Sequence, residues 1–192
     1  MAQISAQEFE RLPLRVHEFL ADVPLHDAWA IDLPHTRSGI TLDEFLRAAS
    51  PDQCKLSLGA RALISIRLFV GRVLGWDREP TAIARETFAA RMTTADRSMS
   101  LVPPGTREGL FRVVYRFENE QLLELINRTA HAAALSALVE VGNAYRFYFG
   151  VYVRSVSRFT PVYMAMIDPF RKLVVYPSLL RSVRSAWNKL AA

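Results

Sequence analysis

The sequence predicts an α+β fold in which a curved antiparallel sheet is followed by one long C-terminal helix. Apolar and aromatic side chains alternate along residues 145–154, as in a strand with one buried face. The inward positions of this strand are Tyr145, Phe147, Phe149, Val151 and Val153. Apolar residues then recur at steps of three and four over residues 160–190, which predicts a helix with a single apolar stripe. The stripe consists of Met166, Phe170, Leu173, Pro177, Leu180, Val183, Trp187 and Leu190.

The other elements are predicted from periodicity and from turn residues. Thr41 and Glu44 have the spacing of a capping box, and Gly142 marks a hairpin turn. The expected helices span residues 7–20, 41–49 and 56–74, and the expected strands span residues 28–34, 110–118, 121–126, 130–141 and 145–154. This order predicts a sheet whose helices cover one side.

Composition favours a single globular domain over residues 1–192. Of the 192 residues, 51% are hydrophobic and 22% are charged, which is typical of a chain with a sizeable core. The single cysteine, Cys54, excludes an internal disulfide and fits a reducing compartment. The first residues lack the basic and apolar regions of a signal peptide, and no run of about 18 uncharged apolar residues occurs. We therefore expect a cytoplasmic protein.

Known catalytic and cofactor motifs are absent from the sequence. It contains no phosphate-binding glycine loop, no dinucleotide-binding glycine motif and no nucleophile elbow. One cysteine cannot form a zinc site made of thiolates. We expect no cofactor, no metal and no nucleic-acid partner.

Five segments carry a resemblance to a known group of proteins. They are Val23–Pro34, Leu74–Asp77, Tyr115–Glu120, Asn127–His131 and Ile167–Pro177. Through them the chain resembles a bacterial domain-of-unknown-function family in or near the START-like (SRPBCC) superfamily, which includes polyketide cyclases and birch-pollen allergens. The resemblance implies a helix-grip fold with a cavity between the sheet and the C-terminal helix. It implies no particular activity, because members range from carriers to enzymes.

The leading hypothesis is binding of a small hydrophobic molecule in that cavity, without catalysis. The expected pocket holds a few hundred Å³, the usual range for a ligand. Its expected lining is Tyr115, Phe117, His131, Tyr145, Phe147, Phe149 and Met164. The oligomeric state does not follow from the sequence.

His131 is the best candidate for a catalytic residue. Asn127, Thr129 and His131 alternate, so an extended chain would turn all three toward one face as ligand-orienting groups. The rival interpretation is a turn at Asn127, a residue that favours such positions. The alternative function is accordingly a cyclase or dehydratase that uses His131 as acid or base.

Two further groups of residues have both a functional and a structural interpretation. His26, Asp27 and His35 could form a metal site, or they could organise a turn into the first strand. Asp168 could be the N-cap of a helix that starts at Pro169, or a carboxylate that faces a ligand. Arg171 is placed to pair with Asp168 in either case.

The positive charge of the chain lies in its last forty residues. Seven of the 24 basic residues fall from Arg154 onward, together with one acid, Asp168. Such a segment could contact an anionic surface, or it could be the solvated face of a helix. The third functional hypothesis is therefore a peripheral membrane or protein-interaction module. We expect membrane contact to be weak, because the apolar stripe of the helix is needed in the core.

Overall fold

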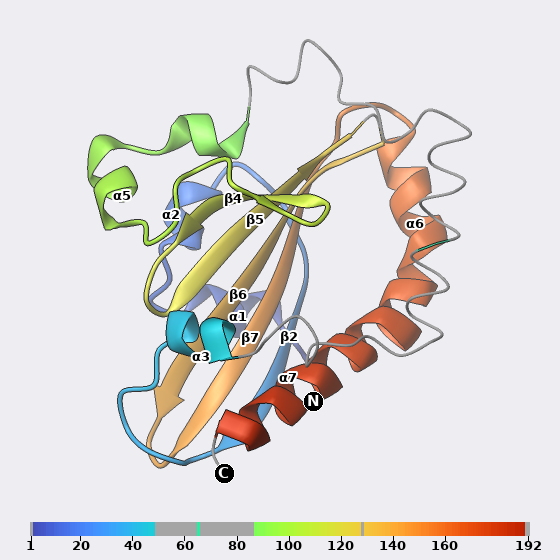
Figure 1. Ribbon diagram of the computed structural model, residues 1–192. Helices are drawn as coiled ribbons and strands as arrows, with labels where there is room; N and C mark the ends of the chain where they lie inside the picture. The colour runs from blue at the N-terminus through green and yellow to red at the C-terminus, as the bar shows by residue number, and fades with distance from the viewer. Residues whose placement is uncertain (1, 49–64, 66–86, 128, 191–192) are drawn as a thin grey trace.

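A seven-stranded antiparallel sheet and a long C-terminal helical segment dominate the structure (Figure 1). The computed structural model describes residues 2–48, 65, 87–127 and 129–190. The strands are β1 (Ala2–Ile4), β2 (Leu25–Pro34), β3 (Arg107–Glu108), β4 (Phe111–Arg116), β5 (Glu120–Ile126), β6 (His131–Val141) and β7 (Ala144–Arg154). They lie in the order β1-β2-β7-β6-β5-β4-β3. The predicted α+β helix-grip architecture is confirmed.

Short helices connect the strands, and three helical segments follow the sheet. The helices are α1 (Ala6–Glu10), α2 (Val16–Phe19), α3 (Leu42–Ala48), the 3-10 helix η2 (Phe88–Arg91), α5 (Thr94–Met99), α6 (Thr160–Phe170), the π-helical η3 (Arg171–Val175) and α7 (Tyr176–Leu190). Thr41 accepts a hydrogen bond from the Glu44 backbone at 3.1 Å, as the capping pattern predicts. Apart from residue 65, the helix expected over residues 56–74 lies outside the described residues.

Helices cover both faces of the sheet, which corrects the expectation of helices on one side. We call the two faces the α1 face and the α7 face, after the helices packed on them. On the α1 face, Ala133 and Leu135 belong to a buried cluster with Phe9. On the α7 face, Phe147 belongs to a second cluster with Trp187. Each face therefore has a core of its own.

The C-terminal segment does not present one continuous stripe to the sheet. Leu180 and Trp187 in α7 are fully buried, as predicted. Met166, Phe170 and Leu173 are instead 51%, 52% and 77% exposed. The expectation that Phe170 and Leu173 pack against the sheet is wrong.

The π-helical turn between α6 and α7 explains this difference. A π turn holds more residues than an α turn, so it shifts the angular phase of everything that follows it. Pro177, two residues after the end of η3, has no N–H to donate to the carbonyl four residues earlier, which favours such an irregularity. Helix α6 also begins at Thr160, so Asp168 lies inside the helix and is not its N-cap.

Candidate functional site

The expected pocket residues do not line one cavity, because they lie on opposite faces of the sheet. Tyr115 and Phe117 pack in the cluster of the α1 face. Tyr145, Phe147 and Phe149 pack in or against the cluster of the α7 face. Met164 is buried in α6.

Strand register causes this separation. Tyr115 is paired with Leu122, Leu122 with Leu135, and Leu135 with Gly150. Directly paired residues share a face, so Tyr115 lies in the row of Gly150 rather than in the row of Phe149. A one-residue difference in register moves a side chain to the other face, and alternation within single strands cannot reveal it.

His131 is part of the core on the α1 face. Its ring stacks on Phe88 at a centroid distance of 3.8 Å, and its Nε2 lies 3.3 Å from Glu124 Oε2. His131 and Glu124 are each 1% exposed, and Glu124 also accepts a hydrogen bond from the Phe88 backbone at 2.8 Å. These contacts give His131 a packing role, and a role in catalysis stays a prediction.

The turn interpretation of Asn127 is confirmed. Its Oδ1 accepts hydrogen bonds from the backbone N–H of Thr129 at 2.9 Å and of Ala130 at 3.0 Å. The Thr129 hydroxyl donates to the same oxygen at 2.6 Å. Asn127 and Thr129 therefore close the turn before β6 and are not available to orient a ligand.

A polar cluster lies on the α7 face, where β2 meets η3. His26 Nε2 is 2.9 Å from Asp168 Oδ2. Arg171 donates to Asp168 Oδ1 at 2.8 Å and to Asp27 Oδ2 at 3.4 Å. It also donates to the hydroxyl of Tyr176, the first residue of α7. The predicted Asp168–Arg171 pair exists, and it joins the C-terminal segment to the first long strand.

Two buried polar atoms in this region have no hydrogen-bond partner among the described residues. They are Oδ1 of Asp27 and Nε1 of Trp29. Burial raises the pKa of the Asp27 carboxyl, which Arg171 opposes. The Tyr176 ring lies 5.6 Å from that of Trp29 and 5.4 Å from that of Phe149, so the polar atoms adjoin an aromatic wall.

The described residues offer three possible metal ligands in the same cluster, one imidazole and two carboxylates. One donor atom each from His26, Asp27 and Asp168 can be chosen so that all lie within 4.8 Å of one another. Arg171 contacts both carboxylates, and Lys172 Nζ lies 3.6 Å from Asp168. Two side-chain cations thus already supply the positive charge that the carboxylates require. His35, expected in the same site, is instead near Glu140.

Beside the aromatic wall, the α7 face continues as a shelf of small and aliphatic side chains. We define this shelf by Leu123, Leu125, Ala132, Ala134 and Ser136, together with Phe149. All six are half-buried. Their neighbours on the opposite face, such as Leu122 and Ala133, are at most 1% exposed. The shelf is therefore apolar, lacks bulky side chains on β6, and is partly open.

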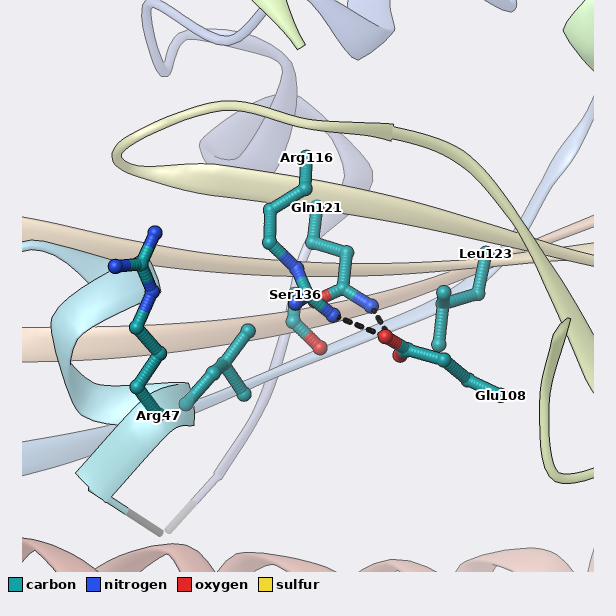
Figure 2. A pocket seen from close by; sticks show the side chains of 7 residues that line it. Arg47, Glu108, Arg116, Gln121, Leu123 and Ser136 are labelled. Atoms are coloured by element: carbon teal, nitrogen blue, oxygen red, sulfur yellow. Dashed lines mark hydrogen bonds and ion pairs between the residues drawn. The ribbon is translucent and has the colours of Figure 1, made fainter. Parts of the chain in front are cut away.

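A pocket of about 390 Å³ is found at one end of the shelf (Figure 2). Its lining comprises Leu46, Arg47, Glu108, Arg116, Gln121, Leu123 and Ser136. Arg116 donates to Glu108 at 2.6 Å and to Gln121 Oε1 at 3.0 Å, which gives this end a polar rim. The pocket includes none of the residues expected from the sequence.

Cross-strand pairing connects this pocket with the aromatic wall. Trp29 pairs with Phe149, Phe149 with Ser136, Ser136 with Gln121, and Gln121 with Arg116. These five residues form one row across the α7 face. Four inter-strand steps of about 4.8 Å give the row a length of about 19 Å. The wall, shelf and pocket are thus parts of one surface.

Comparison with known protein families identifies a match over most of the chain. Residues 19–178 match the family described as a protein of unknown function, DUF2867. The chain therefore belongs to this family. No curated protein and no solved structure matches the chain significantly. None of the helices that the structure describes is long and apolar enough to cross a membrane.

Proposed function

We propose that the protein binds a small hydrophobic molecule on the shelf, between the sheet and the C-terminal helical segment. The observation that carries the proposal is the half-buried state of Leu123, Leu125, Ala132 and Ala134 on the α7 face. An antiparallel sheet can leave one face to solvent, but that face is then usually polar, whereas this half-buried face is apolar. Small side chains on β6, aromatic rings at one border and the pocket that Leu123 and Ser136 help to line at the other end support a ligand site on this surface.

The resemblance to START-like proteins fits this proposal, because helix-grip proteins hold ligands between sheet and helix. Apolar burial would supply most of the affinity, at roughly 25 cal/mol per Å² before ordering costs. Catalysis is not part of the proposal. His131, the candidate acid or base, is enclosed on the opposite face by Phe88 and Glu124.

The proposal is tested by filling the shelf. N-phenyl-1-naphthylamine is a neutral probe whose fluorescence rises in apolar surroundings, and its titration gives an affinity for the protein. Ala134→Phe places a ring above the shelf and should weaken binding at least tenfold. The matched control is Ala2→Phe, which makes the same change at an exposed position of β1. Equal affinity in the two variants would contradict binding on the shelf.

A second candidate function is peripheral attachment to an anionic membrane through α6 and η3. Val162, Met166, Phe170 and Leu173 are 61%, 51%, 52% and 77% exposed. Their spacing of four, four and three residues places them along one side of a helix. The expected reason for weak membrane contact therefore does not apply to α6. Basic residues dominate the segment from Arg154 onward, and an interfacial helix combines such charge with an apolar face.

Vesicle sedimentation tests this second candidate. The protein should sediment with vesicles that contain phosphatidylserine and remain in solution with purely neutral vesicles. Phe170→Ser should reduce the bound fraction, whereas Leu101→Ser, at another exposed apolar position, should not. Equal loss in both variants would argue against a role of α6.

A further inference from the structure

The two unpartnered polar atoms beside the shelf indicate which chemical group the ligand carries. Asp27 Oδ1 and Trp29 Nε1 are both buried without a partner among the described residues. Leaving such a group unsatisfied destabilises the folded state, because its desolvation is not compensated. Native proteins therefore usually satisfy buried polar atoms with protein, water or a ligand.

The two atoms have complementary hydrogen-bonding roles. The carboxylate oxygen of Asp27 can only accept, and the indole N–H of Trp29 can only donate. Asp27 and Trp29 are two positions apart in β2, so their side chains share the α7 face. Tyr176 approaches both residues through its ring contact with Trp29 and through Arg171, which bonds both Tyr176 and Asp27. A group that both donates and accepts would satisfy the pair.

Resting on the proposed function, we infer that the ligand is a neutral apolar molecule whose hydroxyl group binds at Asp27 and Trp29. The hydroxyl donates its proton to Asp27 Oδ1 and accepts from Trp29 Nε1. A carboxylic acid does not fit, because its anion would face both Asp27 and Asp168. Arg171 cannot compensate, because it is already bonded to Asp168, Asp27 and Tyr176.

The position of Asp27 places the rest of the ligand on the shelf. Asp27 pairs with Val151, Val151 with Ala134, and Ala134 with Leu123. Leu123 also lines the pocket of about 390 Å³. Asp27 and Ala134 are separated by two inter-strand steps, or about 10 Å. A hydroxyl at Asp27 therefore leaves the apolar body of a ring-sized molecule above Val151 and Ala134.

Three probes with one carbon skeleton test the inference. They are naphthalene, 2-naphthol and 2-naphthoate, and their affinities are measured by fluorescence titration at pH 7. We expect 2-naphthol to bind at least tenfold more tightly than naphthalene, since a hydrogen bond to a charged group contributes about 1.5–3 kcal/mol. We expect 2-naphthoate to bind more weakly than 2-naphthol.

Two variants identify the partners of the hydroxyl. Asp27→Asn and Trp29→Phe should each reduce the ratio of 2-naphthol to naphthalene affinity, which compares two probes on the same variant. Trp29→Phe keeps the test decisive if Asp27→Asn fails to fold. Trp187→Phe is the matched control, because its indole N–H donates to the Pro34 carbonyl instead, and the ratio should not change.

The outcomes separate this inference from the proposed function. Equal affinities for naphthalene and 2-naphthol would overturn the hydroxyl assignment. If Ala134→Phe still weakens the binding of both probes, binding on the shelf would nevertheless be supported. Preference for 2-naphthoate would overturn the assignment in favour of an anion site at Arg171. Failure of all three probes to bind would refute both the inference and the proposed function.

Discussion

Replacing one leucine within the π-helical turn and one after it tests how the C-terminal segment meets the sheet. Leu180 in α7 is fully buried, and Leu173 in η3 is 77% exposed. Leu→Ala at a buried site removes apolar contacts and leaves a cavity, which costs about 2–5 kcal/mol. The same change at an exposed site alters stability by about 0.5 kcal/mol or less. We therefore expect Leu180→Ala to reduce the free energy of unfolding by about 3 kcal/mol and Leu173→Ala to leave it nearly unchanged.

Urea denaturation followed by circular dichroism measures both variants against the wild type. The two substitutions are chemically identical and lie seven residues apart, so helix propensity cancels in the comparison. A continuous α-helical stripe would bury both leucines, because seven residues is close to two full turns. Equal destabilisation by the two changes would therefore refute the phase shift at η3.

Three further predictions concern the α1 face. Burial raises the pKa of Glu120 from its ordinary 4.5 to about 7. Between these pH values the folded state holds a proton that the unfolded state releases. The free energy of unfolding should therefore fall by about 3 kcal/mol as the pH rises from 4.5 to above 7. Urea midpoints of wild type and Glu120→Gln should diverge over that range, and parallel pH profiles would contradict the assignment. Gly150→Ala should lower the free energy of unfolding by about 1–3 kcal/mol, because the added Cβ would lie 2.8 Å from the enclosed Phe9 ring. An unchanged urea midpoint would show that the ring can move. His131→Ala should destabilise the fold by about 2–4 kcal/mol yet leave naphthalene affinity unchanged, and a loss of affinity would place His131 in the binding site.

Local patterns in the sequence were sufficient to predict the main elements of the fold. Alternation identified β7, and steps of three and four identified a helix over residues 160–190. Both signals depend on neighbouring residues alone. The Asn127 turn and the Thr41 cap were predictable for the same reason, because each is closed by side chains within three residues.

The site could not be predicted because it depends on long-range register. The aromatic rows of β4 and β7 look alike in sequence, but three consecutive pairings place Tyr115 and Phe149 on opposite faces. The π-helical turn likewise changes which side of the helix faces the sheet, although in the sequence only the flanking prolines, Pro169 and Pro177, signal it. His26, Asp27, Asp168 and Arg171 were noticed as local pairs, and only the fold brings the two pairs together.

The place of Trp29 and Tyr176 in the candidate site had no clear signal in the sequence. Trp29 lies in an alternating strand and Tyr176 precedes a proline, so both resemble ordinary core residues. Their relevance appears only in the ring contact between them and in the unpartnered indole nitrogen. Unsatisfied buried atoms are a property of the tertiary structure, and no one-dimensional pattern records them.

Native mass spectrometry of the protein purified from its own cells tests the central proposal most directly. If the shelf binds a small hydrophobic molecule, the wild type and Ala2→Phe should retain an adduct of small-molecule mass, and Ala134→Phe should lose it. Organic extraction and high-resolution mass measurement should then give a neutral molecule with at least one hydroxyl group. The same adduct on Ala134→Phe at equal occupancy would contradict binding on the shelf.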